Sequence, residues 1–311
     1  MPNIDAGHYF LTVLLPIRRD PVEIYDHVVT TPMLAVREWL AGLPTAHQSP
    51  VCVSAGNSPF ARNLRNHFAR FSVIDVPAFN GRVQTDAVVM ALRKINPIVP
   101  QPVDQLNTPY LFFSADFNCI HGDDRDLESY LATLWATMEP EIRKIFQYCY
   151  GFETVESAAT FTAFIKRGQV ETTMPFHDYW IDTPKLPTLP LPLMGAAALI
   201  GGLALLVGFV ALVAHGHVLV WLLLTLIGAG IFFGLYKFVM ARGVQPFPAA
   251  HGADLPGVLK SLYLQKQFTR FAIDNQGADP AALHAAFAAF LQTHQPDHVA
   301  SPTQAPGVIG A

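Results

Sequence analysis

The sequence has few charged side chains for its length. Asp, Glu, Lys and Arg make up 14% of its 311 residues, whereas hydrophobic residues make up 51%. A share of charge this low is unusual for a water-soluble protein and points to a membrane. The net charge of −4 also argues against a nucleic-acid partner, which would need a basic surface.

Cysteine and catalytic motifs are scarce as well. Cys52, Cys119 and Cys149 are odd in number and widely spaced, which predicts reduced thiols and argues against a disulfide framework or a metal site. The chain lacks Cys-x-x-Cys-His for covalent haem, His-Glu-x-x-His, Gly-x-Ser-x-Gly and a phosphate-binding loop. The sequence therefore leaves open whether the protein is an enzyme.

Two long apolar runs are the strongest signal that is present. Residues 193–214 and 218–236 contain no charged side chain and are separated by His215-Gly216-His217. As helices they would each span about 28–33 Å, the thickness of a bilayer's hydrocarbon core. We predict a transmembrane hairpin within residues 190–240. The alternative, a buried hairpin in a large water-soluble core, would need an equally apolar shell that the flanking sequence does not offer.

The flanks of the hairpin predict its orientation. The turn has no Lys or Arg, and the nearest basic residues are Lys166, Arg167, Lys185, Lys237 and Arg242. The positive-inside rule therefore places both termini in the cytoplasm, and the start of the chain does not resemble a signal peptide. Trp221 and Tyr236 suit interfacial anchors, and Gly230-x-x-x-Gly234 would allow close contact with the first span.

Residues 1–182 are long enough to form a core of their own. Their pattern predicts strands at 9–17, 65–75 and 110–117, helices at 32–42, 123–149 and 158–167, and an extended segment at 172–180. Pro140 should either kink the helix at 123–149 or begin a second one. This order is that of a ferredoxin-like split βαβ unit. It predicts an α+β fold with helices on one face of an antiparallel sheet.

The remaining segments are connections and a tail. Residues 76–109 form an insertion of a length typical of a lid, a binding loop or a contact arm. Within residues 243–311 we expect a linker at 243–253, two short helices at 255–272 and 280–294, and a disordered tail rich in Pro, Gly and Ala.

Several stretches resemble a family. "HFARFSVID", "LFFSADF", "LESYLATLW" and "AFIKRGQVETTMPFHDYW" are similar to an uncharacterised bacterial family that carries H-F-A-R and L-F-x-S-N motifs. That family is remotely similar to dimeric α+β barrel proteins, which include dye-decolorising peroxidases and chlorite dismutases. The resemblance covers about residues 67–180 without the insertion. It implies that His67, Arg70, Ser114 and Asp116 form one neighbourhood, and it makes haem a possible cofactor.

The chain also departs from the family. Gly168 stands where the family has a His after "IKR", and "NCIHG" replaces its compact Asn-(Phe/Tyr)-Asp-Gly turn. The Gly-x-x-Asp-Gly element of dye-decolorising peroxidases is absent. Haem binding is therefore implied only by remote kinship.

Alternation along the strands predicts a charged pair. It places Arg70 on the opposite face of its strand from Arg65 and His67, and it places Ser114 and Asp116 on one face of theirs. If Arg70 lies across from Asp116, the two form a partly buried ion pair. The pair either fixes the register of the strands or binds a ligand carboxylate or a haem propionate.

Histidines are the other candidate site residues. His67 could be a haem axial ligand or a general base, because a neutral imidazole offers a lone pair near pH 7. A hydrogen-bonded structural role is the alternative. His121 and His177 are weaker candidates for the same roles. His215 and His217 could bind a metal, although two His without a third ligand are more typical of a polar turn.

Two functions fit these observations. The first is a membrane-anchored cytosolic domain that serves as an accessory or assembly subunit of a membrane protein complex, with protein partners in the bacterial inner membrane. The second is a haem-binding or other oxidoreductase-like protein that acts on a lipid-soluble substrate at the membrane face.

Overall fold

The three long strands expected from the sequence pair in one antiparallel sheet. The computed structural model describes residues 3–25, 28–45, 56–77, 87–94, 105–172 and 188–308. β2 (His8–Pro16) pairs with β6 (Tyr110–Asn118), and β6 pairs with β5 (Asn66–Ile74). The short strands β1 (Ile4–Asp5) and β7 (Gln169–Val170) both pair with β2 on its other side. A separate ribbon of β3 (Val22–Tyr25) and β4 (Val28–Thr30) was not expected.

The helices of the N-terminal part agree with the sequence pattern, except for a helix at residues 87–92 in the insertion, which was not expected. They are α1 (Pro32–Ala41), α2 (Ala87–Leu92), α3 (Asp124–Phe146) and α4 (Ala158–Gly168). Thr31, Asp123 and Ser157 cap α1, α3 and α4 by accepting hydrogen bonds from backbone N–H groups of the first turn. The expected kink in α3 is confirmed, because Met138, two residues before Pro140, has non-helical backbone angles.

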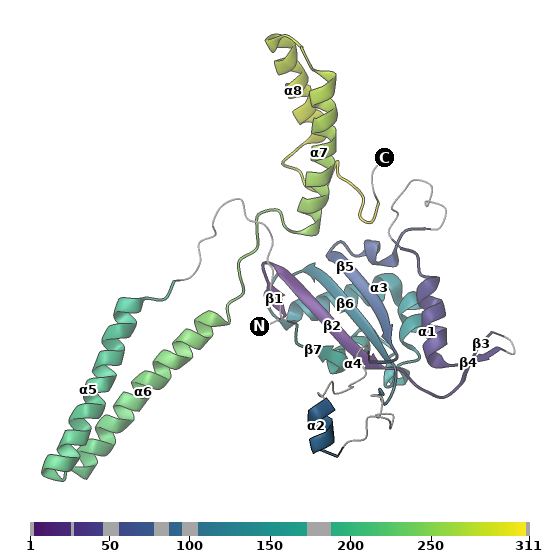
Figure 1. The fold of residues 1–311 in the computed structure, drawn as a ribbon. Helices are drawn as coiled ribbons and strands as arrows, with labels where there is room; N and C mark the ends of the chain where they lie inside the picture. Colours follow the sequence, from purple (N-terminus) through teal and green to yellow (C-terminus); the bar gives the residue numbers. More distant parts are fainter. Residues whose placement is uncertain are drawn as a thin grey trace.

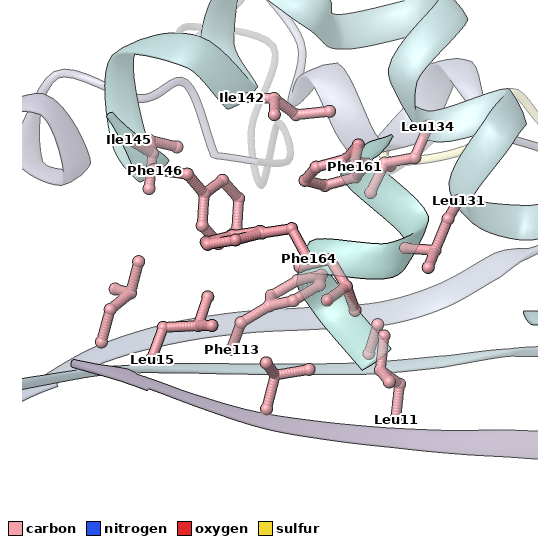
Figure 2. Packing of buried hydrophobic residues seen from close by; sticks show 14 of the residues in the cluster. Leu11, Leu15, Phe113, Leu131, Leu134, Ile142, Ile145, Phe146, Phe161 and Phe164 are labelled. Carbon is pink, nitrogen blue, oxygen red and sulfur yellow. The ribbon is translucent and has the colours of Figure 1, made fainter. Parts of the chain in front are cut away.

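Burial alternates along the strands because helices cover one face of the sheet, whereas most of the other face has no covering element among the described residues. Leu11, Val13 and Leu15 of β2 are fully or almost fully buried, while the residues between them are partly exposed. Figure 1 shows α1, α3 and α4 behind the sheet. In Figure 2 the buried side chains of the strands point toward those of α3 and α4.

Aromatic rings fill this interface. Phe113 of β6 meets the edge of Phe146 of α3, with the ring centroids 6.0 Å apart. Phe146 in turn makes edge contacts with Phe161 and Phe164 of α4. Such contacts add to the stabilisation that burial of the rings provides. The core is therefore a layer of rings between the sheet and two helices.

The two apolar runs form the helices α5 (Leu191–His215) and α6 (Val218–Gly243), which stand apart from the sheet in Figure 1. Only 11% and 6% of their most apolar windows are buried. The alternative of a hairpin enclosed in a water-soluble core is therefore not what the structure shows. Both helices are long and apolar enough to cross a membrane.

The contact between α5 and α6 uses other glycines than those expected. A Cβ added at Gly228 would lie 2.6 Å from Leu205 Cγ and 2.9 Å from the carbonyl oxygen of Gly201. Gly230 and Gly234, by contrast, have nothing within 4 Å of such a Cβ, so they do not contact α5. The expectation for Gly230-x-x-x-Gly234 was wrong, because the rotation of α6 depends on packing along its whole length.

The C-terminal residues form a helical pair that touches the sheet. α7 (Leu255–Asp274) and α8 (Pro280–His294) are joined by buried Lys260, whose Nζ donates to the carbonyl oxygens of His294 and Pro302. Burial lowers the pKa of Lys260. The composition predicted a disordered tail, whereas the carbonyl of Pro306 accepts a hydrogen bond from Asn57 Nδ2. Backbone hydrogen bonding can thus hold a segment that has little to bury.

Part of the expected organisation lies outside the described residues. Of the insertion 76–109, the structure describes residues 76–77, 87–94 and 105–109, which include α2. The extended segment at 172–180, with His177, and the domain boundary at 182 fall almost entirely outside.

Gly228→Ala should loosen the hairpin, because the new methyl group would collide with the backbone of α5. We expect the free energy of unfolding of the hairpin to fall by about 1–3 kcal/mol, the usual cost of overpacking. Titration with SDS, followed by circular dichroism of the helices, measures it. Gly230→Ala is the matched control and should be neutral or slightly stabilising. Equal effects of the two changes would contradict the observed helix contact.

Candidate functional site

Polar side chains gather at one end of the sheet, where β2 and β5 begin and β6 ends. His8 lies opposite Asn118 in the antiparallel register. Its Nδ1 is 3.1 Å from Asp116 Oδ1, and its ring centroid is 4.8 Å from that of His67. His67 Nε2 is hydrogen-bonded to Asn118 Oδ1. These four residues, His8, His67, Asp116 and Asn118, are called the polar cluster below.

The helical pair covers part of this cluster. The backbone N–H of Leu255, at the start of α7, donates to Asn118 Oδ1 over 3.3 Å. His8 is 7% exposed although it starts an apolar strand. Burial of polar groups is tolerated here because each of the four side chains has a hydrogen-bond partner.

A β-bulge brings His67 into the cluster. Asn66 pairs with Phe117 and Phe68 with Asp116, so His67 is an extra residue in β5 without an opposite partner. Simple alternation placed His67 on the face away from Arg70 and Asp116. That expectation was wrong, because a bulge interrupts the alternation and re-aims the side chain.

The register also separates the expected ion pair. Arg70 lies opposite Ser114, and Asp116 lies opposite Phe68. Within the described part of the chain, Asp116 contacts His8, whereas the Arg70 guanidinium lies over the rings of Phe68 and Phe112, 5.9 and 5.4 Å from their centroids. The Arg70–Asp116 pair is therefore corrected to a His8–Asp116 contact.

The core-facing side of the same strands explains why Arg70 and Asp116 do not pair. Phe71 pairs with Phe113, and the two rings stack with centroids 4.8 Å apart. Matching these buried rings fixes the register, and it moves Arg70 two residues away from the position that would face Asp116.

A buried carboxylate, Asp126, lies beside the cluster at the start of α3 and holds the preceding loop. This fully buried carboxylate accepts hydrogen bonds from the backbone N–H groups of Ile120, His121 and Gly122, at 2.7–3.0 Å. Arg65 Nη2 lies 3.0 Å from its Oδ1. The carboxylate thus fixes the loop between β6 and α3.

These contacts shift the pKa values of two groups, Asp126 and Cys119. Burial tends to raise the pKa of Asp126, but the Cys119 thiol and the three backbone N–H groups outweigh it and hold that pKa well below its ordinary value. The pKa of Cys119 is raised to about 12 by burial and by its hydrogen bond to Asp126. The pKa of buried Cys149 is also raised to about 12. Both thiols therefore stay protonated at neutral pH and are poor nucleophiles.

The other histidines predicted as site residues lie in two different places. His121 lies in the loop, with its Nδ1 3.2 Å from Asp126 Oδ1 and its side chain 47% exposed. The rings of His215 and His217 are 5.9 Å apart at the hairpin tip. Within the described ranges, no group of three His, Cys, Asp or Glu side chains could hold a metal ion.

Sequence reasoning missed His8 and the Arg65–Asp126 pair. His8 directly precedes the apolar core of a strand, and nothing local distinguishes it from a residue at a strand end. Asp126 had a signal: it is the third residue of a helix whose N-cap is Asp123, a position from which a carboxylate reaches free backbone N–H groups.

A groove runs beside the cluster. It has a volume of about 640 Å³ and is lined by every residue of β5 from Asn66 to Phe71. Leu255, Leu259 and Pro306 also line it. His67 and Arg70 both face this groove, so the sequence-predicted neighbourhood is divided between the groove and the interior of the cluster.

The arrangement is suited to binding and positioning. Asp126 is fully engaged by the loop, and the thiols of Cys119 and Cys149 are protonated. The polar cluster holds two imidazoles but aligns neither with a nucleophile among the described residues. A bound ligand would meet aromatic surface, one guanidinium and one imidazole.

Asp126→Asn should lower the free energy of unfolding at pH 7 by about 3 kcal/mol, because it removes the charge that balances Arg65 and mismatches the loop N–H groups. The folded-state pKa of Asp126 is depressed. Its stabilisation is therefore complete above the unfolded-state pKa and lost as the pH falls through the folded-state value. The difference between wild type and variant should accordingly shrink below about pH 4.

Urea unfolding of the full chain in a non-ionic detergent, followed by tryptophan fluorescence, measures this difference. Asp124→Asn is the control, since Asp124 is exposed in the first turn of the same helix. If that variant were as unstable as Asp126→Asn, the loop anchor would not be the cause.

Comparison with known proteins assigns no family to this chain. No protein-family model matches the chain, and no curated protein or solved structure does. The resemblance based on the sequence motifs stays a hypothesis.

Proposed function

We propose that this protein is a membrane-anchored α+β domain that serves as an accessory or assembly subunit of a membrane protein complex. The observation that carries the proposal is the uncovered face of the sheet. Phe68 is 52% exposed and Ile74 37%, and Phe10, Leu14 and Phe112 are partly exposed on the same face. A row of large apolar side chains on a sheet face is typical of a surface that binds another protein.

The face combines apolar surface with charge. Arg70 lies over the rings of Phe68 and Phe112. Aromatic residues and Arg are the side chains enriched at the centres of protein interfaces, where they contribute most of the binding energy. The face is therefore suited to a protein partner in composition as well as in exposure.

The membrane hairpin would bring the domain close to a partner in the same membrane. α5 and α6 could cross a membrane, and the domain is connected to both ends of this hairpin. The Lys and Arg residues that flank the hairpin favour cytoplasmic termini, which in a bacterium would put the domain on the cytoplasmic side of the inner membrane. A partner in the same membrane would meet the domain at high effective concentration.

We also propose a ferredoxin-like topology for the domain. The spatial order β7, β2, β6, β5 and the passage of the chain through α1 between β2 and β5 support it. In such a split βαβ unit one face of the sheet carries the helices, which leaves the other face for contacts.

Phe68→Asp should disrupt partner binding without unfolding the domain, because Phe68 is half exposed on the open face. After mild cross-linking and purification in a non-ionic detergent, the recovery of specific membrane proteins should fall by about tenfold, the loss expected when a well-buried interface residue is removed. Ile273→Asp, at an exposed position of α7, is the control and should leave recovery unchanged. A free monomer without co-purifying membrane proteins, in wild type and control alike, would refute the proposal.

The haem-binding alternative fits the described residues poorly. His67 Nε2 is occupied by Asn118, and Gly168 replaces the family histidine. A Cβ at Gly168 would lie 2.6 Å from Leu15 Cδ2 and 2.9 Å from the carbonyl oxygen of Leu14, so this place has no room for a side chain.

We therefore expect the purified protein to show no Soret band, even after haem is added. Absorption spectroscopy of wild type and His67→Ala tests this expectation. A Soret band in the wild type that His67→Ala removes would restore haem binding as the function.

A further inference from the structure

Among the described residues, β5 leaves one long edge of the sheet unpaired. It is the last strand in the sheet, and no strand of the described ranges pairs with its outer edge. The strand has nine residues, contains no proline and is irregular only at the bulge near its start. Proteins usually protect such an edge, because its free N–H and C=O groups are a template for another strand.

The edge lies in a walled groove. The six consecutive residues Asn66–Phe71 line the groove of about 640 Å³. Its other lining residues include Leu40 and Leu43 at the end of α1 and in the turn after it, Phe60, Leu255 and Leu259 of α7, and Pro306 and Gly307, which lie against Asn57 and Ala61. A paired strand needs about 4.8 Å beside its neighbour, and six paired residues extend over about 20 Å. A groove lined by six consecutive residues of such a strand is suited to an extended peptide.

The charge of the groove selects the peptide. Arg70 and His67 line it, and none of its lining residues in the described part of the chain is Asp or Glu. The Arg70 guanidinium lies over Phe68 and Phe112 and has no carboxylate partner within the described part of the chain. A carboxylate that approached along β5 would meet a guanidinium already held in place by two rings.

The two sides of the edge differ in polarity. Alternate side chains of an added strand would point toward the apolar wall at Phe60 and Phe71 and toward the open face at Phe68 and Arg70. An occupant in which apolar and acidic residues alternate satisfies both sides.

We propose that the groove binds an extended acidic segment of a partner protein, which adds to the sheet as a strand on the free edge of β5. The inference rests on the proposed function, because it names the kind of segment by which a partner would be held. Main-chain hydrogen bonds to β5 provide affinity, and the contacts of alternate side chains provide specificity.

The test uses the full-length protein in a non-ionic detergent and a short fluorescein-labelled peptide of alternating valine and glutamate. We expect fluorescence anisotropy to show saturable binding. The same peptide with lysine in place of glutamate should bind about tenfold more weakly, the scale expected for a charge reversal at an interface. The glutamate peptide with N-methyl groups on alternate backbone amides should not bind, because it cannot donate to the strand edge.

Two variants locate the binding. Arg70→Glu should weaken the glutamate peptide and strengthen the lysine peptide, which reverses the preference. Arg270→Glu, at an exposed position of α7, makes the same change in net charge and should preserve the preference of the wild type. Circular dichroism checks that both variants are folded, and Arg70→Gln, which should abolish the preference, replaces Arg70→Glu if that variant is unfolded.

The outcomes separate this inference from the proposed function. Absence of binding by both peptides, equal binding of the N-methylated peptide, or a preference that Arg70→Glu leaves unchanged would overturn strand addition at β5. None of these results would affect the recovery of membrane partners through the open face. Because Phe68 lines both surfaces, Ile74→Asp, at an exposed position of the open face outside the groove, tests that recovery independently.

Discussion

Burial of one sheet face under α3 and α4 is the constraint on which the rest of the domain depends. Phe113 contributes to a ring layer with Phe146, Phe161 and Phe164, and these rings are at most 1% exposed. Removing this much aromatic surface from water provides a large part of the folding free energy. Because the rings fix the pairing of Phe71 with Phe113, they also decide which polar residues meet on the opposite face.

The polar features follow from that register. His67 is a bulged residue beside His8. Asp116 contacts His8, and the Arg70 guanidinium lies over the rings of Phe68 and Phe112. Asp126 then fixes the loop that leads from β6 into α3. The polar side chains at one end of the sheet are thus hydrogen-bonded, while the open face and the edge of β5, which no described strand pairs with, present surface that another chain can use.

The strands, the helices and the membrane hairpin could be predicted because their signals are local. Alternating or continuous apolar residues marked β2, β5 and β6, and Pro140 marked the kink in α3. The glycine contact of the hairpin could not be predicted. Gly228 and Gly230 are equally small, and only the rotation of α6 against α5 buries the first and exposes the second.

The sequence by itself determined the kind of elements, their order and the apolar hairpin, since side-chain periodicity acts within one element. Only the tertiary structure decided the site. Whether Arg70 faces Ser114 or Asp116 depends on a shift of two residues between strands that are about forty residues apart in the chain. The bulge at His67 moves that side chain to the other face of the sheet. That register is set by buried rings from both strands and from α3, a packing relation between distant residues that no local pattern contains.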